Sequence, residues 1–167
     1  MFNYGSKFSR DNDLIKDCIQ ELFVTLWMRK DFLGTPVNVK NYLYKAFRLL
    51  LFKDAKMIQQ NITYEESEYY DFDATLSIED STIEGENIQH VQERLQQKLN
   101  QLSPRQREAI FLKFYEGLNY DEIAEVMDIS VKGSYKLMAR ALDSLRGMLS
   151  REDFLLVLFF FSTKLYH

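Results

Sequence analysis

The sequence has little of what most enzymes and secreted proteins use. It contains one cysteine, Cys18, so no disulfide can form within the chain, and a lone thiol is typical of a reducing cytoplasm. Its two histidines, His90 and His167, cannot form a metal site with Cys18 on grounds of spacing. A glycine-rich phosphate loop is also missing. We therefore predict that the chain is no enzyme and uses no metal, cofactor or small-molecule substrate.

Long apolar runs are missing as well. The first residues, "MFNYGSKFSRDND", have no apolar secretory core. The longest apolar run, "FLLVLFFF" at Phe154–Phe161, is far shorter than the roughly 20 residues that span a bilayer. We expect a cytoplasmic protein without stable membrane insertion. The run must be buried against the C-terminal domain, in a gap beside the N-terminal domain, or on a partner.

Basic residues are missing from one segment. Residues 58–92 contain nine Asp or Glu and no Lys or Arg, whereas residues 1–57 contain ten basic and six acidic residues. Residues 58–86 within it show no sustained hydrophobic period, and we predict a mobile linker there, with at most a short helical piece. Its carboxylates would not be held in place as a catalytic pair. Its Tyr64, Tyr69, Tyr70 and Phe72 are unusual for a pure spacer.

The sequence does contain apolar residues at helical spacing. Hydrophobic residues make up 46% of its 167 residues, enough for a packed core in one ordinary domain or two very small ones. The spacing predicts helices over residues 13–30, 39–56, 87–101, 104–115, 120–127 and 131–149, and neither strands nor repeats. We therefore predict an all-α protein with two small helical domains. The predicted segments are residues 1–57, an acidic linker at 58–86, a second domain at 87–149 and an apolar tail at 150–167.

Helix-start signals divide the second domain. Ser103 precedes Pro104 and stands three residues before Gln106, which is the pattern of a capping box. Asn119 stands three residues before Glu122 in the same way. Gly117 marks the end of the helix between them.

Residues Tyr120 to Leu137 fit a helix-turn-helix. Ala124 supplies the small residue where the two helices touch, and Asp128, Ile129 and Ser130 supply the turn. Ser130 is placed to cap the second helix. The residues that we expect to be exposed near the start of that helix, where a recognition helix enters the major groove, are Lys132, Ser134, Tyr135 and Lys136.

The motif departs from the usual pattern at two points. The turn has Asp128 where Gly is common, and Asp tolerates a left-handed backbone. Ser134 stands where an apolar residue is usual, beside Gly133, which predicts a loosened or shifted start of the recognition helix. The alternative to DNA binding is a three-helix packing unit whose basic residues form a solvated face.

Three segments resemble a known family. "LSPRQREAIFLKFYEGLNYDEIAEVMDISVKGSYKLMARALDSLR" resembles region four of a bacterial sigma factor of the extracytoplasmic-function group. "DLIKDCIQELFVTLW" is similar to the part of region two that grips the clamp helices of core RNA polymerase. "VKNYLYKAFRLLL" resembles the following helix, which meets the −10 promoter element. The resemblance covers nearly all of residues 4–149.

The resemblance implies roles for particular residues. The residues that match the polymerase-binding pattern are Asp17, Gln20, Glu21, Phe23, Leu26 and Trp27. Those that match positions near the −10 element are Lys40, Asn41, Lys45 and Arg48. The candidates for −35 DNA are Arg105, Ser130, Lys132, Ser134, Tyr135, Lys136 and Arg140. The alternatives are core packing for Phe23 and Trp27, a solvated face for the second helix, and packing or a salt bridge for Arg140.

The resemblance also implies a function and partners. It predicts a sigma factor that binds core RNA polymerase and promoter DNA and has an anti-sigma partner. Region two normally begins with a further helix, and "FNYGSKF" resembles only its tail, so the chain is either truncated or a short member. The apolar stripe on residues 13–30 is too wide for one neighbouring helix to cover, so part of it should be exposed or covered by the C-terminal tail. The competing interpretations are a helix-turn-helix regulator not tied to polymerase, and a protein-interaction module.

Overall fold

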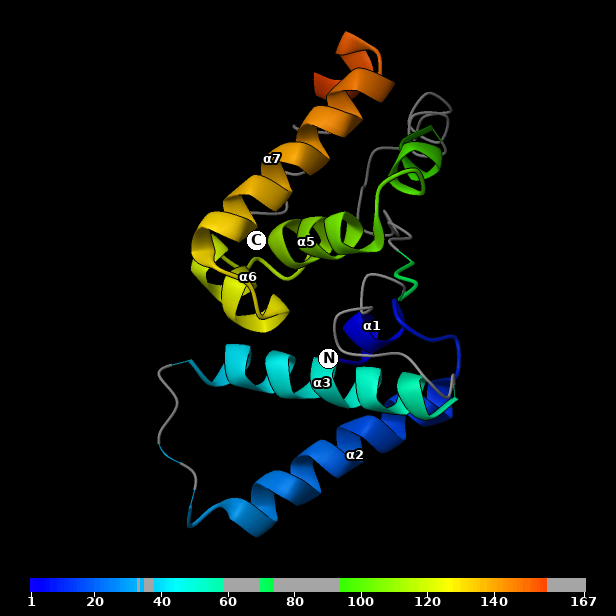
Figure 1. The fold of residues 1–167 in the computed structure, drawn as a ribbon. Helices are drawn as coiled ribbons and strands as arrows, with labels where there is room; N and C mark the ends of the chain where they lie inside the picture. The colour runs from blue at the N-terminus through cyan, green and yellow to red at the C-terminus, as the bar shows by residue number, and fades with distance from the viewer. Residues whose placement is uncertain (33, 35–37, 59–69, 74–93, 156–167) are drawn as a thin grey trace, which may run out of the picture.

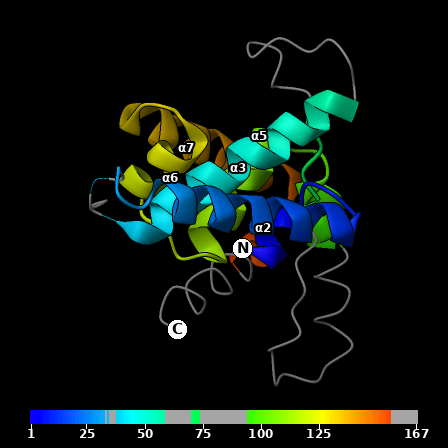
Figure 2. The same cartoon turned by 90° about the horizontal axis from the view of Figure 1, so that it is seen from below.

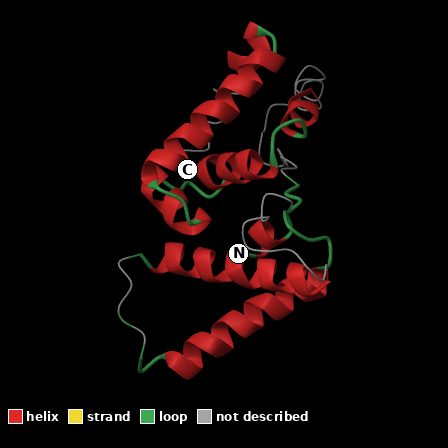
Figure 3. Cartoon of the chain, viewed as in Figure 1, coloured by secondary structure: helices red, strands yellow, loops and turns green. Residues whose placement is uncertain are grey.

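The described part of the chain is helical. The computed structural model describes residues 1–32, 34, 38–58, 70–73 and 94–155. The helices are α1 (Phe2–Gly5), α2 (Asn12–Arg29), α3 (Val39–Ile58), α5 (Pro104–Phe114), α6 (Tyr120–Met127) and α7 (Val131–Met148). Residues 94–99 and 151–155 are also helical. No strand occurs among the residues described (Figure 3), so the prediction of an all-α fold is confirmed for them.

The N-terminal unit consists of α1, α2 and α3. The Asp11 carboxylate begins α2 by accepting hydrogen bonds from the backbone N–H groups of Asp13 and Leu14, at 3.0 and 3.1 Å. Helix α2 runs beside α3 (Figure 1) and buries a narrow apolar stripe at Ile15, Cys18 and Leu22. The bounds of α2 and α3 agree with the predicted helices at 13–30 and 39–56. The sequence between the two helices, "LGTPVN" at residues 33–38, predicts a loop, and the structure describes only residues 34 and 38 of it.

The C-terminal unit consists of α5, α6 and α7. Capping boxes at Ser103 and Asn119 begin α5 and α6, as predicted. Gly117 follows α5 with a φ of +70°, a backbone conformation that glycine adopts without strain. Because both helices begin at their caps, local side-chain signals set the boundaries of this unit.

The start of α7 is regular, so the predicted loosening or shift is wrong. Ser130 caps the helix by accepting a hydrogen bond from the backbone N–H of Gly133 at 3.0 Å. A Cβ atom on Gly133 would lie 3.1 Å from that Ser130 Oγ, closer than most Cβ contacts. Glycine at this position therefore lets the cap approach the helix, which outweighs its poor helix propensity.

The two units pack against each other. Helix α3 lies between α2 on one side and α6 on the other (Figures 1 and 2). Aromatic rings from both units meet beside α1, where Tyr4 is fully buried and stacks 6.1 Å from the ring of Phe111 on α5. The sequence left the relative placement of the two domains open, and this packing supplies it.

Part of the predicted mobile linker is packed between the units. We call residues 70–73 the clip. Phe72 has no exposed surface, and its ring centroid lies 5.0 Å from that of Phe8 and 5.7 Å from that of Phe111. The backbone N–H of Asp73 donates a hydrogen bond to the carbonyl of Lys7 at 2.7 Å. The prediction of a mobile linker is therefore wrong for the clip, and residues 59–69 and 74–86 lie outside the described residues.

The ends of the C-terminal unit are described in part. Of the helix predicted over 87–101, residues 94–99 are helical and residues 87–93 lie outside the described residues. After α7, Phe154 packs half-buried against the core, and the Asp153 carboxylate lies 3.2 Å from the Arg94 guanidinium. Residues 156–167 are not described, so the alternatives for the apolar tail stay open. None of the helices in the described ranges combines the length and apolar character that crossing a membrane requires.

Candidate nucleic-acid and polymerase interface

Helix α2 presents an exposed face along its length. Of the residues predicted to bind polymerase, Asp17, Gln20 and Glu21 are exposed, and Leu26 is half-buried. Phe23 is 52% exposed and Trp27 is 73% exposed, so the alternative that they are core residues is wrong. The apolar surface continues through further exposed residues, namely Val24, Met28 and Phe32. The prediction that part of the wide stripe is exposed is confirmed.

Helix α7 presents the second predicted face. Lys132, Tyr135, Lys136 and Arg140 are exposed on it. The predicted exposure of Ser134 is wrong, because Ser134 is 1% exposed. Its hydroxyl proton is shared between the carbonyls of Tyr120 and Val131, which lie 2.9 and 2.8 Å from the Ser134 Oγ. Ser134 therefore fixes the start of α7 from within, and Ser130 uses its hydroxyl as the cap.

A tyrosine of α6 packs against this face. The ring of Tyr120 lies 4.0 Å from the ring of Tyr135, centroid to centroid, and the Lys113 ammonium lies 5.0 Å from the Tyr120 ring. Sequence reasoning missed Tyr120, although its place at the first position of α6 keeps it close to the start of α7. The other candidate for −35 DNA, Arg105, is half-buried at the start of α5.

Helix α3 presents a third predicted face, and the C-terminal unit covers part of it: Asn41 and Arg48 are buried, Lys45 is half-buried and Lys40 is exposed. Lys40 Nζ donates to the carbonyl of Glu116 at 2.7 Å. Asn41, which is 2% exposed, donates to the Glu125 carboxylate at 3.1 Å. The alternative of a solvated basic face is therefore wrong for Asn41.

The contacts continue along α3 toward its C-terminal end. Lys45 Nζ lies 2.9 Å from Asp128 Oδ1, and this bond lowers the pKa of the Asp128 carboxyl. Beside these contacts, Tyr44 donates to the Glu116 carboxylate at 2.5 Å. Burial and this hydrogen bond raise the pKa of the Tyr44 hydroxyl.

A buried polar cluster joins the two units next to that face. The Glu108 carboxylate on α5 has no exposed surface and accepts two hydrogen bonds from the Arg48 guanidinium, at 2.7 and 3.1 Å. It also accepts from the hydroxyls of Tyr4, at 2.5 Å, and Tyr70 of the clip. Together these donors satisfy a buried charge that would otherwise be costly. The sequence analysis assigned Arg48 to DNA and missed Glu108, the one acidic residue of α5, which directly precedes the apolar run "AIFL".

The pKa values of the cluster follow from burial and from Glu108. Burial raises the pKa values of Tyr4 and Tyr70 well above that of a free tyrosine, and the negative charge of Glu108 raises them further. Burial lowers the pKa of Arg48, but the Glu108 carboxylate outweighs it, and the net pKa is raised. At neutral pH the cluster therefore holds neutral tyrosines around an ion pair.

The C-terminal unit and the whole fold both match known proteins. Residues 92–145 match the family Sigma-70, region 4. No curated protein was found to match the chain. Among solved structures the chain is similar to the sigma factor RpoE in complex with the anti-sigma factor NepR from Bartonella quintana, with 19% identity, 87% of each chain covered and a TM-score of 0.57. At that identity the likeness shows the fold. Residues 92–145 therefore match region 4 of sigma-70, and the chain has the fold of the sigma factor that it resembles, in agreement with the resemblance seen in the sequence.

Proposed function

We propose that the chain binds core RNA polymerase through α2, reads the −35 promoter element with α7 and meets the −10 element with α3. The observation that carries the proposal is that the region matching Sigma-70, region 4 contains a helix-turn-helix whose second helix exposes Lys132, Lys136 and Arg140. Cations near the start of such a helix neutralise phosphates while polar side chains reach base edges. Tyr135 is exposed and is the residue best placed to reach base edges.

The exposed face of α2 supports the polymerase assignment. A soluble chain rarely leaves several large apolar side chains together in solvent unless a partner covers them. Trp27 is the candidate anchor, because tryptophan is enriched among the residues that dominate binding energy. Asp17 and Glu21 lie one helical turn apart and form an acidic edge beside the apolar surface.

The proposed organisation and partners follow from these assignments. Residues 1–57 serve as a partial region two, residues 87–149 as region four, and the protein works in the cytoplasm without a small-molecule substrate. The similar sigma factor from Bartonella quintana was solved with an anti-sigma factor. We propose a partner of that kind for this chain, covering the exposed faces of α2 and α7.

The proposal is tested with purified chain, core RNA polymerase and promoter DNA. We expect the chain to bind polymerase and support promoter-dependent transcription. Lys136→Glu should weaken promoter binding about tenfold, because it replaces a phosphate-neutralising cation by an anion, and it should leave thermal unfolding unchanged. The matched control is Lys16→Glu, which makes the same charge change at an exposed position of α2.

Two results would count against the proposal. Promoter binding that is unaffected by Lys136→Glu would exclude α7 as the recognition helix. A chain that binds DNA but never binds polymerase would instead be a helix-turn-helix regulator, and the α2 assignment would fail.

A further inference from the structure

The side chains of α3 assigned to the −10 element lie on one face of that helix. Asn41, Lys45 and Arg48 are spaced by four and three residues, which aligns them along one side, and Lys40 lies next to Asn41. In the structure each of them contacts the C-terminal unit. The partners are the carboxylates of Glu125, Asp128 and Glu108 and the carbonyl of Glu116.

These partners resemble DNA phosphates in charge and in the way they accept hydrogen bonds. Carboxylates and phosphates are both anionic acceptors for lysine and arginine. The contacts leave Asn41 2% and Arg48 9% exposed, so DNA cannot reach these side chains while α6 lies on α3. DNA and the C-terminal unit must therefore compete for this face.

The clip fastens the two units together beside that face. The ring of Tyr70 lies 4.9 Å from that of Phe52 on α3, while its hydroxyl donates to Glu108 on α5. The Asp71 carboxylate lies 3.2 Å from the Arg107 guanidinium on α5. Phe72 fills the space between Tyr4 and Phe111. Taken together, these contacts tie the clip to both units.

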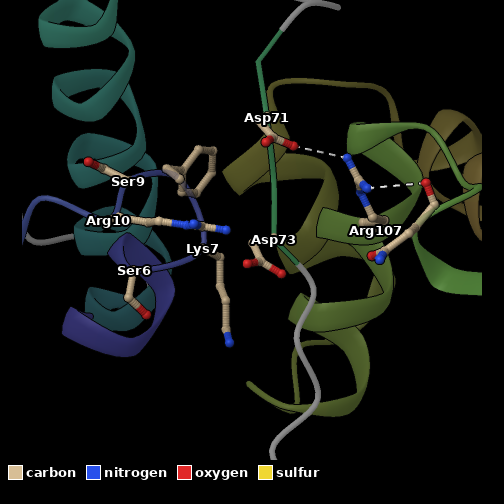
Figure 4. Close-up of a pocket in the computed structure, with 9 residues that line it drawn as sticks. Ser6, Lys7, Ser9, Arg10, Asp71, Asp73 and Arg107 are labelled. Carbon is tan, nitrogen blue, oxygen red and sulfur yellow. Dashed lines mark hydrogen bonds and ion pairs between the residues drawn. The ribbon is translucent and has the colours of Figure 1, made fainter. Parts of the chain in front are cut away.

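A cavity marks the place where the clip passes between the units. Its volume is about 300 Å³, and it is lined on one side by residues 6–10 and on the other by Arg107. Figure 4 shows Asp71 and Asp73 on the clip between these two sides, with Asp71 facing Arg107. The clip therefore contacts both units in a charged, water-accessible setting where it can be released.

Within the described residues, the other two faces are exposed in the same conformation. Trp27 on α2 and Lys136 on α7 are both exposed. Polymerase can therefore bind α2 while the −10 face of α3 is still covered.

We infer that the chain masks its own −10 binding face: carboxylates of the C-terminal unit occupy α3 in place of DNA phosphates, and the clip at residues 70–73 latches this closed state. The inference rests on the proposed function of α3. Because only open molecules bind DNA through α3, the apparent affinity equals the intrinsic affinity multiplied by the fraction of molecules that are open. Release of the clip is then the step that exposes α3 to the promoter.

Two different variants should open the chain. Phe72→Ala removes the ring that fills the junction. Glu125→Ala with Asp128→Asn removes the anions facing Asn41 and Lys45, and asparagine tolerates the left-handed backbone of residue 128. The matched control, Asp121→Asn with Asp143→Asn, removes as many negative charges from exposed positions of the same unit.

Compaction and DNA binding are measured on the full-length variants. The radius of gyration comes from small-angle X-ray scattering. DNA binding is measured with a short fluorescein-labelled duplex of mixed sequence, with every protein also carrying Lys132→Gln and Lys136→Gln to weaken the contribution of α7. We expect both opening variants to expand and to bind the duplex about 3- to 10-fold more tightly than the control.

The outcomes separate the inference from the proposed function. A wild-type chain as expanded as the opening variants, or variants that expand without gaining affinity over the control, would overturn the inference. A loss of the helical circular dichroism signal would mean that Phe72→Ala has unfolded. The variant with Glu125→Ala and Asp128→Asn then tests the inference alone. Binding of core RNA polymerase to the same proteins tests the proposed function separately. If all of them bind polymerase and duplex affinity does not change, the inference alone fails; if none binds, the proposed function fails whatever the compaction.

Discussion

Helices α3 and α7 are both basic, but α3 packs its basic face against the C-terminal unit, whereas α7 exposes its basic face to solvent. On α3, Arg48 is 9% exposed and forms an ion pair with a carboxylate that has no exposed surface. On α7, Arg140 is exposed to solvent. The two arginines belong to the same residue type and to similar helical patterns, yet one is part of the core and the other is part of a surface.

The difference lies in what stands opposite each helix. Helix α3 faces the acidic side chains of α5 and α6, whereas the outer face of α7 meets solvent in the described structure. A basic helical face therefore indicates affinity for anions but not which anion occupies it. The occupant is set by tertiary packing.

The largest expected effect is the loss of stability on truncating Arg48, compared with truncating Arg140. Arg48→Ala should lower the free energy of unfolding by about 3–5 kcal/mol, because it leaves the buried Glu108 carboxylate without its cation. Arg140→Ala should change it by less than about 0.5 kcal/mol, as for most exposed substitutions. Urea denaturation followed by circular dichroism measures both. Similar losses for the two variants would remove the distinction between the faces.

An intermediate effect is expected from alkaline pH. The folded-state pKa of Tyr4 is raised by burial and by Glu108, so the stability that its neutral hydroxyl contributes is present below the unfolded pKa of about 10. It is lost as the pH rises above that value. In this range Tyr4→Phe should make the decline in unfolding free energy shallower by about 1.4 kcal/mol per pH unit. Denaturation curves at rising pH test this, and parallel curves throughout would show that Tyr4 is not linked to folding.

The smallest effect is expected at the solvent-exposed end of the covered face. Lys45 and Asp128 have side chains that are 37% and 56% exposed, so water screens their attraction. A double-mutant cycle with Lys45→Ala and Asp128→Asn should give a coupling energy of about 0.2–1 kcal/mol. The coupling should fall as salt is added. A coupling energy of zero would mean that this pair does not help to hold the units together.

Much of each unit could be predicted from the sequence, because local signals set it. The caps at Ser103, Asn119 and Ser130 use side chains within three residues of the backbone groups that they bind. The turn at Asp128 adopts the left-handed backbone that the sequence analysis allowed. Such signals act within one helical turn, so the sequence shows them directly.

The packing between the units could not be predicted in the same way. Arg48 and Glu108 are 60 residues apart, and no local pattern indicates that they meet. The acidic composition of the segment concealed the clip, because Phe72 is a buried ring between the acidic residues Asp71 and Asp73. Serine is polar, so Ser134 is expected on the surface. In the structure it is buried, and backbone carbonyls accept the hydrogen bond from its hydroxyl.

Asp128 has a consequence for anyone who would engineer this protein for stability. Its φ of 55° is one that glycine adopts more easily, so Asp128→Gly is the substitution that backbone preference recommends. The same residue supplies the anion that faces Lys45. A better turn would therefore come with a weaker contact to α3. On the masking inferred above, a variant selected for heat resistance of the C-terminal unit alone would also expose α3 more readily.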